Sequence, residues 1–363
     1  MFKTLLISSE YPPGPGGIGT HAYQVANTLF NNKKWVVVCT ISDYANAKEV
    51  KNFDENSLFQ VVRFKRYRNH IINWYYRINT VCRTIINQKI THVFVSGRAS
   101  VWLIPVIKLI SNVKIIAIIH GSEFKIGLSG KFSLACLQFA SNLIAVSKFT
   151  KSLIPQRMQL RTVVSHNGID LSEWRSQIIR PNLENYPILL TVGSLSLRKG
   201  QHNIINALPF IKKQYPNVHY HCVGQTKEKE RLLKLIHKLG LGNSVSIHGI
   251  VSKSTLEDLY NESHVNMILS EKTHDGDREG YGISVLEGNI FGVPAIGSNH
   301  SGLKESITHN LNGVLVDQTN PKEIVKALNN ILFNYDNFYN NSIKNAKNNS
   351  WHKKIRHYEN FIK

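Results

Sequence analysis

The chain has 363 residues, of which 42% are hydrophobic and 9% aromatic, and this apolar content suffices for two ordinary globular domains. It excludes disordered, fibrous and disulfide-stapled proteins. The 44 Lys and Arg residues against 24 Asp and Glu give a formal charge of +20. Such a charge favours phosphate-rich partners, namely nucleic acid, anionic lipid or phosphorylated small molecules.

The four cysteines lie far apart and lack the spacing of a zinc site, which favours a reduced, cytoplasmic compartment. They are Cys39, Cys82, Cys136 and Cys222. The N-terminal apolar stretch is too short for a signal peptide. The longest apolar tract, 101–119, is broken by a proline and several polar residues, so it predicts a buried helix and then a buried strand rather than a membrane span.

In the first half of the chain, short β-branched runs alternate with segments of helical periodicity. Continuous apolar strands in this arrangement predict a parallel sheet with helices on both faces. The strands are expected at 3–9, 35–41, 92–96, 114–119 and 142–147. The first predicted domain is therefore a doubly wound α/β domain that spans 1–170.

A polar stretch at 171–186, with little periodicity, predicts a linker, and a second α/β series then spans 187–345. Strands are expected at 188–192, 218–223, 245–248 and 264–269, and helices at 201–213, 228–239, 285–291 and 323–332. At the end, 346–363, Trp351 and three further apolar residues recur at helical spacing and predict a final helix. The chain is expected to form two similar domains with a cleft between them.

Positive charge is concentrated in the first domain, because residues 1–175 hold 22 basic and 8 acidic residues and residues 176–363 hold 22 and 16. Much of the excess lies in a segment of basic, aromatic and isoleucine residues. It comprises Arg63, Lys65, Arg66, Arg68, Ile71, Ile72, Trp74, Tyr75, Tyr76, Arg77, Ile78, Arg83, Ile85, Ile86 and Lys89. Such a helix can lie on an anionic bilayer, or it can be a solvated helix whose isoleucines face the core.

Three segments carry candidate chemistry, and the first is the glycine-rich stretch 11–29 between the first strand and a helix. Its glycines, Gly17 among them, let the backbone approach a ligand, and the free N–H groups at the helix start attract anions. The stretch therefore indicates a phosphate cradle. A tight turn without a ligand is the alternative.

The second segment, 192–200, places Arg198 and Lys199 where the next helix should begin. Cations are unfavourable at a helix N-terminus unless an anion lies between them, so the pair indicates a bound diphosphate. The alternative is that two solvated cations tolerate the small electrostatic penalty.

The third segment, 277–298, holds two carboxylates eight residues apart, Glu279 and Glu287, around the turn formed by Gly280, Tyr281 and Gly282. The carboxylates could bind different hydroxyl groups of one ligand, while the N–H groups of Gly282 and Ile283 face its phosphates. Alternatively, Ser284 and Glu287 form a Ser-x-x-Glu capping box.

These segments together resemble the family 4 retaining glycosyltransferases of GT-B fold, in which two Rossmann-like domains face each other across a cleft. The resemblance rests on YPPGPGGIG, RKG, EGYGISVLE and FGVPAIGS, with HGSE, AVSKFT, HNGID, SGLKE and NGVLV between them or after them. It covers nearly the whole chain, and the motifs occur in the family's order.

The resemblance implies that the second domain binds a nucleotide diphospho-sugar and that the first binds the acceptor. Glu287 would hold the ribose hydroxyls, Arg198 and Lys199 the diphosphate, and Glu279 the hydroxyls of the donor sugar. Tyr281, Gly282 and Ile283 would line the donor site, and Gly17 would meet the phosphates from across the cleft. His120, at the end of the strand 114–119, would lie against the sugar near the reacting carbon, although a hydrogen-bonded loop histidine is the alternative.

In this family, side-chain cations replace a metal ion, so no cofactor is expected. The Asp-x-Asp pair of Asp275 and Asp277 is accordingly interpreted as a solvated loop rather than a metal site. Relatives often carry an arginine where this chain has Ser194, and Arg198 is the candidate to replace it. The resemblance also implies that the final helix crosses back onto the first domain, with Trp351 as a packing anchor.

The predicted protein is a cytoplasmic, peripheral membrane enzyme of hexosyl- or N-acetylhexosaminyltransferase type. It would transfer sugar from a UDP- or GDP-sugar to a lipid-linked saccharide in bacterial O-antigen or capsule assembly. One alternative is a nucleotide-sugar 2-epimerase of the same fold. The other is a non-catalytic basic protein that binds membrane or nucleic acid, but no nucleic-acid motif is present and nucleic acid is not an expected partner.

Overall fold

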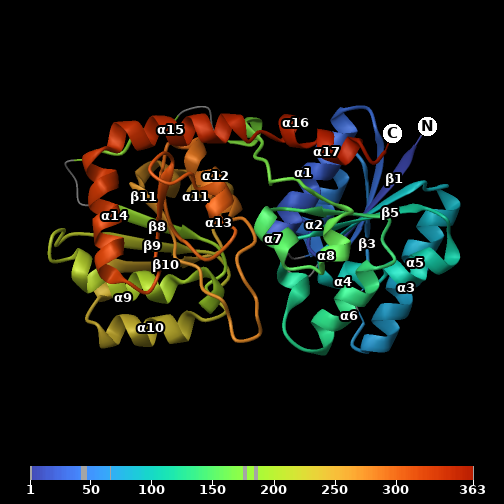
Figure 1. Cartoon of the computed structure of the whole chain (residues 1–363), viewed down its shortest axis with the longest axis horizontal. Helices are drawn as coiled ribbons and strands as arrows, with labels where there is room; N and C mark the ends of the chain where they lie inside the picture. The colour runs from blue at the N-terminus through green and yellow to red at the C-terminus, as the bar shows by residue number, and fades with distance from the viewer. Residues whose placement is uncertain (1, 42–46, 66, 175–177, 184–186, 363) are drawn as a thin grey trace. The chain divides into compact units, whose positions relative to one another are not determined.

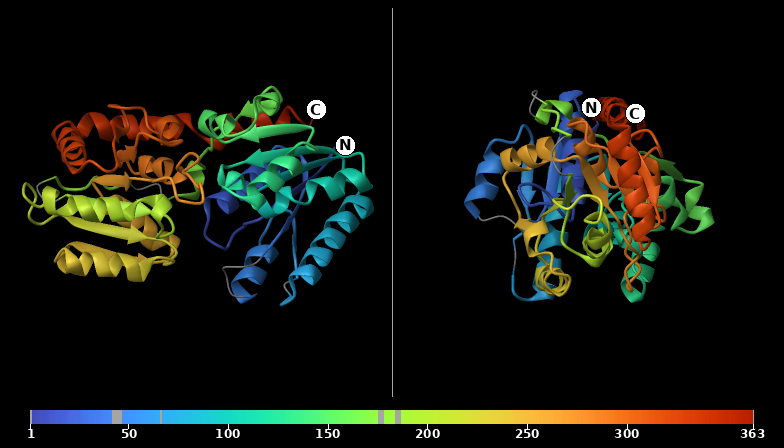
Figure 2. Two further views of the ribbon diagram at one scale, coloured as in Figure 1. Left: turned by 60° about the horizontal axis from the view of Figure 1, so that its bottom comes forward. Right: turned by 90° about the vertical axis from the view of Figure 1, so that its left-hand side faces the viewer.

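The computed structural model describes residues 2–41, 47–65, 67–174, 178–183 and 187–362. The chain forms two compact units, the first made of the residues up to Asn167 together with the segment from Trp351, and the second of Gly168–Ser350 (Figure 1). Each unit contains one parallel sheet with helices on both faces (Figure 2). The predicted fold class, two doubly wound α/β domains, is therefore confirmed.

The first unit is built on a seven-stranded parallel sheet of order β3-β2-β1-β4-β5-β6-β7. Its strands are β1 (Lys3–Ser8), β2 (Trp35–Thr40), β3 (Gln60–Arg63), β4 (His92–Ser96), β5 (Lys114–Ile119), β6 (Asn142–Ala145) and β7 (Thr162–Val164). Its helices are α1 (Gly17–Asn31), α2 (Ala47–Glu55), α3 (His70–Asn87), α4 (Arg98–Val101), α5 (Ile104–Ile110), α6 (Leu128–Leu137), α7 (Lys148–Ser152), α8 (Gln156–Gln159), α16 (Trp351–Lys354) and α17 (Arg356–Glu359), with a 3-10 turn, η1 (Ser122–Phe124). The strand order reverses between β1 and β4, which is where ligands bind in such sheets.

The core of the first unit lies on both faces of this sheet. On one face, Val81 and Ile85 of α3, Ile104 of α5 and Leu137 of α6 pack with the strands. On the other face, α1 packs on β1 and β2, and the ring of Tyr358 from α17 lies 6.1 Å from the ring of Phe94 in β4. Because both faces are covered, the central strands are buried almost end to end, as the continuous apolar runs predict.

The C-terminal segment differs from the single helix predicted for 346–363. Helix α15 (Tyr335–Asn348) ends where Asn349 accepts a hydrogen bond from the N–H of Ile169, and the two short helices α16 and α17 follow. Backbone pairing between Ile169 and Ser350 interrupts the helix at this point. Trp351 is only 3% exposed and lies edge-on to His21 of α1.

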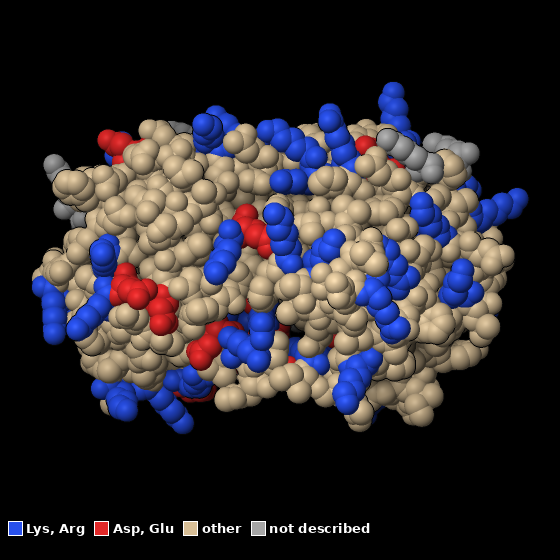
Figure 3. Space-filling view, in the orientation of Figure 1, with Lys and Arg blue, Asp and Glu red and all other residues tan. Residues whose placement is uncertain are grey.

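The basic, aromatic segment contains helix α3, which the sequence predicts either to lie on an anionic bilayer or to turn its isoleucines toward the core. Ile78 and Ile85 face the core, whereas Ile71, Ile72 and Ile86 are exposed, so the isoleucines divide between the two environments. Arg66 lies outside the described residues. Figure 3 shows basic side chains over both units, while most of the visible acidic ones lie over the second unit.

The second unit is built on a six-stranded parallel sheet of order β10-β9-β8-β11-β12-β13. Its strands are β8 (Ile188–Val192), β9 (His219–Val223), β10 (Val245–Gly249), β11 (Val265–Ile268), β12 (Ala295–Ser298) and β13 (Gly313–Val316). Its helices are α9 (Gln201–Ile211), α10 (Lys229–Lys238), α11 (Lys253–Glu262), α12 (Ile283–Ile290), α13 (Leu303–Ser306), α14 (Pro321–Phe333) and α15, with the 3-10 turns η2 (Leu171–Glu173), η3 (Leu197–Lys199) and η4 (Gly242–Ser244). Helices α9, α10 and α14 supply the core on one face of the sheet, and α12 and α13 pack on the other.

Most predicted elements exist in the structure, with ends that shift by one or two residues. Strands β4, β5 and β8 match their predicted ranges, whereas β3, β7, β12 and β13 were not predicted. Helix α12 begins at Ile283, two residues before its predicted start. Part of the predicted linker 171–186 lies outside the described residues, and its start forms η2.

We expect Trp351→Ala to lower the free energy of unfolding by about 3 kcal/mol, because the substitution leaves a cavity against His21 that the unit cannot fully close. Urea-induced unfolding followed by circular dichroism measures this. Phe333→Ala is the control, since Phe333 is 90% exposed and its truncation should change stability by less than about 0.5 kcal/mol. Equal losses for both variants would contradict the packing role of Trp351.

Candidate active site

In the second unit, the candidate residues lie on loops that follow the carboxyl ends of β8, β11 and β12. These strands are parallel neighbours, so their carboxyl ends share one edge of the sheet. The loop after β8 carries Arg198 and Lys199, and the long loop after β11 carries Glu279. Ligands of open α/β sheets bind at this edge.

The loop after β8 is fixed by backbone approaches that only glycine permits. Gly200 has the left-handed φ of 73°, and a Cβ atom there would lie 1.7 Å from the carbonyl oxygen of Leu269. At Gly193, a Cβ would lie 2.9 Å from Cε of Lys199. The N–H of Leu197 also donates to Glu228. Arg198 and Lys199 therefore project from a short, tightly held turn, just before α9.

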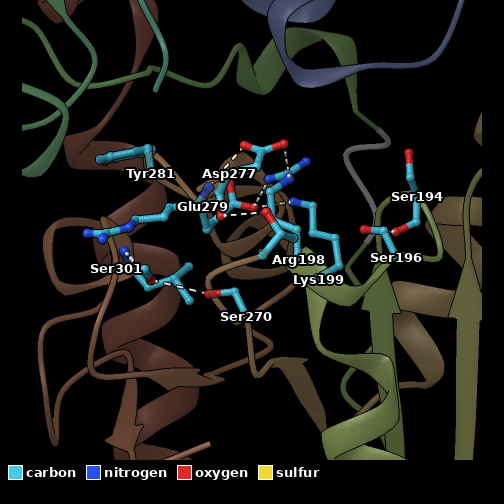
Figure 4. A network of polar contacts seen from close by, with 12 residues as sticks. Ser194, Ser196, Arg198, Lys199, Ser270, Asp277, Glu279, Tyr281 and Ser301 are labelled. Atoms are coloured by element: carbon cyan, nitrogen blue, oxygen red, sulfur yellow. Dashed lines mark hydrogen bonds and ion pairs between the residues drawn. The ribbon is translucent and has the colours of Figure 1, made fainter. Parts of the chain in front are cut away.

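Both cations bind the carboxylate of Glu279 (Figure 4). Its Oε2 atom lies 2.6 Å from Nη1 of Arg198 and 2.7 Å from Nζ of Lys199. Burial alone raises the pKa of Glu279, but the charges of Lys199 and Arg198 outweigh it and lower the pKa to about 2. Asp277 adds a weaker contact, 3.7 Å from Nε of Arg198. The predicted diphosphate cations thus form one cluster whose counter-ion is Glu279.

The turn between Glu279 and α12 brings this carboxylate to the helix start. Gly282 has φ of 83° and caps α12, and its N–H donates to the carboxylate of Glu279. The ring of Tyr281 is 2% exposed and points away from the cations in Figure 4. The N–H of Gly302, in the loop after β12, donates to the carbonyl of Glu279 and holds the turn in place.

Glu287 lies in α12, and its Oε2 accepts a hydrogen bond from the hydroxyl of Tyr260 at 3.0 Å. Burial raises the pKa of Glu287, although this hydrogen bond and the charges of Lys199 and Lys253 oppose the shift. The capping-box alternative is wrong, because Gly282 is the N-cap and Ser284 already lies in the first turn. Glu287 therefore does not cap α12.

Three serine hydroxyls near this edge were not predicted from the sequence, and a fourth, that of Ser284, was considered only as part of a capping box. Ser270, after β11, lies 2.7 Å from Ser298 of β12 and 3.3 Å from Ser301, so three buried hydroxyls form a chain. The hydroxyl of Ser284, at the N-terminus of α12, is buried and has no hydrogen-bond partner among the described residues. Only Ser270 directly follows a predicted strand, 264–269, and a serine in that position is too common to single out.

In the first unit, His120 directly follows β5. Its Nε2 lies 2.9 Å from the hydroxyl of Ser96, and its ring lies 5.0 Å from that of His21. The backbone N–H of His120 donates to the carboxylate of Glu123. Burial lowers the pKa of His120 to about 4, so the imidazole is neutral at pH 7. Gly17 is the first residue of α1, whose N-terminus has no side-chain cap. The candidates thus fall into two sets, two residues in the first unit and seven in the second.

The Asp-x-Asp loop is internally bonded. Thr273 donates to Asp275 at 2.5 Å, and the N–H of Thr273 donates to the carbonyl of Asp277. Across the described ranges, no three His, Cys, Asp or Glu side chains are grouped so that they could hold a metal ion. The backbone carbonyl of Ser194 accepts a hydrogen bond from the side-chain amide of Gln201.

Comparison with known proteins identifies the family. Residues 15–173 match the model of "Glycosyltransferase Family 4", and residues 173–349 match that of "Glycosyl transferases group 1". The two matches adjoin and together span nearly the whole chain. The chain belongs to glycosyltransferase family 4.

Relatives of this glycosyltransferase are distant in sequence. A GDP-mannose-dependent alpha-(1-6)-phosphatidylinositol monomannoside mannosyltransferase of Mycobacterium tuberculosis is 24% identical over 353 residues, which cover 93% of this chain and 90% of the relative. The putative colanic acid biosynthesis glycosyltransferase WcaL of Escherichia coli is 24% identical over 168 residues, 46% of this chain and 41% of the relative.

Solved structures share the fold. Anabaena Alr3699/HepE in complex with UDP and glucose aligns with a TM-score of 0.80 at 17% identity, over 99% of this glycosyltransferase and 98% of that chain. The predicted GT-B class is thereby confirmed. No helix in the described part of the glycosyltransferase is both long and apolar enough to span a bilayer.

The ion cluster of the glycosyltransferase should make its stability depend on pH. Glu279 has an ordinary pKa of 4.5 and a folded pKa of about 2, so its stabilisation is complete above pH 4.5 and is lost as the pH falls toward 2. Relative to Glu279→Gln, the wild type should lose about 2 kcal/mol of unfolding free energy between pH 7 and pH 3. Urea titrations at both pH values measure this. A constant difference would show that Glu279 is not held ionised by the two cations.

Proposed function

We propose that this glycosyltransferase transfers a hexosyl or N-acetylhexosaminyl group from a UDP- or GDP-sugar, with retention of anomeric configuration, to a lipid-linked saccharide. The acceptor belongs to bacterial surface polysaccharide assembly, of O-antigen or capsule type, at the inner face of the cell membrane. The observation that carries the proposal is the ion cluster at the sheet edge, in which the half-buried cations Arg198 and Lys199 share the buried carboxylate of Glu279. Relatives named for colanic acid biosynthesis and for mannosyl transfer from GDP-mannose support the pathway and the donor class.

The cluster suits a diphosphate because its two cations are adjacent, half-buried and already paired with one carboxylate. When a donor binds, its diphosphate takes over as counter-ion of Arg198 and Lys199, and Glu279 turns to the sugar hydroxyls. The hydroxyl of Ser284, which has no hydrogen-bond partner in the described part of the chain, and the N–H of Ile283 lie in the first turn of α12 and supply further donors for the phosphates. Arg198 thereby serves in place of the arginine that Ser194 replaces.

The reaction requires stabilisation of charge rather than a strong base. As the bond from sugar to phosphate breaks, negative charge grows on the leaving diphosphate, where Arg198 and Lys199 are preorganised to meet it. Same-face attack, with the leaving phosphate assisting deprotonation of the acceptor, gives retention. His120 is a neutral imidazole and acts as a hydrogen-bonding partner of the sugar rather than as a cation. Gly17 contributes a backbone N–H toward the phosphates.

The donor grip requires no metal ion in this proposal, because the side-chain cations occupy the role that a divalent ion has in other glycosyltransferases. Transfer should therefore proceed unchanged in EDTA. Loss of activity in the chelator, with recovery on addition of magnesium or manganese, would refute the metal-free proposal.

We expect Lys199→Ala and Glu279→Ala each to reduce kcat/KM for the donor about 100-fold, because each removes a charged group that the transition state needs. Transfer of radiolabelled sugar from UDP- and GDP-sugars to a lipid extract measures the rate. Lys322→Ala is the control for the first variant, since Lys322 is an exposed cation on α14. Wild-type rates in both site variants would reject the proposed donor site.

The same assay distinguishes the proposed transferase from the alternative enzyme of the same fold. A nucleotide-sugar 2-epimerase would release an epimerised free nucleotide sugar without any acceptor, which nuclear magnetic resonance of the products detects. Detection of that product, with no glycosylated lipid formed, would contradict the proposed transfer and show that the protein is an epimerase. Family membership favours an enzyme over a non-catalytic binding protein.

The exposed end of α3 suits an anionic bilayer surface, which is where a lipid-linked acceptor would be met. Ile71 is 79% and Tyr75 is 63% exposed, and the exposed cations Arg68 and Arg83 flank them. Arg63 of the segment is committed elsewhere, since it forms an ion pair with Asp54. Apolar side chains beside cations bind the boundary between headgroups and acyl chains.

We expect the double variant Ile71→Asp, Tyr75→Asp to weaken binding to vesicles that contain anionic lipid by about tenfold or more, since it removes apolar contacts and adds like charge. Vesicle co-sedimentation at low and high salt measures this. The control is Phe333→Asp, which places the same charge at an exposed apolar position of the second unit. Equal binding by the double variant and the wild type would remove α3 from the membrane proposal.

A further inference from the structure

Tyr260 lies behind Glu287 and has no part in the function described so far. It belongs to α11, is fully buried, and donates its hydroxyl hydrogen to Oε2 of Glu287 at 3.0 Å. Burial and the neighbouring carboxylate raise the pKa of Tyr260 well above its usual value, so the hydroxyl stays protonated and remains a donor. One oxygen of Glu287 therefore has a permanent partner within the protein.

The position of this hydroxyl is fixed by aromatic packing around the ring. The ring of Tyr260 stacks on Phe291 with centroids 5.4 Å apart and an interplanar angle of 7°. Trp174 meets both rings edge-on, at 6.1 Å from Tyr260 and 5.6 Å from Phe291. A ring held on two sides cannot swing its hydroxyl away from Glu287 without disturbing the packing.

Helix α12, which carries Glu287, also packs against Tyr260 and Asn266. A Cβ at Gly288 would lie 3.2 Å from Nδ2 of Asn266, which is a tight approach, and 3.4 Å from Cε1 of Tyr260, which is ordinary van der Waals contact. The side chain of Asn266 also donates to the carbonyl of Ser284 at 2.6 Å. The backbone that carries Glu287 and the ring that binds its carboxylate are thus positioned together.

We propose that Tyr260 is a positioning residue that orients the Glu287 carboxylate for the ribose hydroxyls of the donor and so makes the site selective for ribonucleotides over deoxyribonucleotides. The inference rests on the proposed function, which assigns the ribose to Glu287. A carboxylate that rotates freely can accept from one hydroxyl in many orientations. With Oε2 held by Tyr260, the carboxylate plane is set, and the remaining acceptor positions match the two adjacent hydroxyls of a ribose.

The test measures binding of UDP and GDP, and of their 2′-deoxy and 3′-deoxy counterparts, to the full chain by titration calorimetry. We expect Tyr260→Phe to weaken binding of the ribonucleotide about tenfold and binding of the deoxy compounds much less, which lowers the selectivity ratio. Tyr335→Phe is the matched control, because Tyr335 is also buried but its hydroxyl has no hydrogen-bond partner among the described residues. It should leave every affinity unchanged.

A second variant guards against a general loss of packing. In the Glu287→Gln background, Tyr260→Phe should have no further effect on the selectivity ratio, because the group it positions is already altered. Equal weakening of ribo- and deoxynucleotides by Tyr260→Phe, or wild-type affinities in that variant, would overturn the inference. If the wild type binds none of the nucleotides, the proposed donor site fails, and the inference fails with it.

Discussion

The carboxylate of Glu279, shared by Arg198 and Lys199, is the interaction on which the rest of the site depends. Two adjacent cations on one short turn repel each other, and taking them out of water is costly unless an anion neutralises them. Glu279 supplies that anion from a different loop, and it is 7% exposed, so the three groups interact with little screening by water. This arrangement keeps the cation pair preformed while no ligand is bound, and a diphosphate carries enough negative charge to compete for it.

The residues of this site were recognisable in the sequence, but their mutual contacts were not. Cations at a helix start and two carboxylates eight residues apart are local patterns, and each has a physical cost that indicates a ligand. The ion pair between Lys199 and Glu279 joins residues 80 positions apart, and the bond between Tyr260 and Glu287 joins two helices. Such contacts depend on how loops leave a sheet. The capping box failed for the same reason, because the left-handed Gly282 starts α12 earlier than the apolar pattern does.

The same distinction holds for the fold. Strands with unbroken apolar runs, such as β5, were predicted to the residue because both faces of the sheet bury them. Strand β12, with the sequence AIGS, was missed because glycine and serine dilute the pattern. Close packing explains the glycine, since a Cβ at Gly297 would lie 2.5 Å from Cδ1 of Ile307, the residue that follows α13. In β12, tertiary packing therefore overrides the low strand propensity of glycine and serine.

The two units place different kinds of groups at their candidate sites, and the difference follows from burial. In the first unit His120 lies beside His21, and burial lowers the pKa of both, so the two imidazoles stay neutral together. His21 is in turn bound by the hydroxyl of Tyr358, which ties the C-terminal segment to the histidine pair. The second unit instead collects fixed charges around Glu279. Departure of a diphosphate needs positive charge, whereas a sugar carbon that gains positive character is disfavoured by a nearby cation. Under the proposed function, the charged cluster of the second unit meets the first of these demands, whereas the histidine pair of the first unit carries no fixed positive charge.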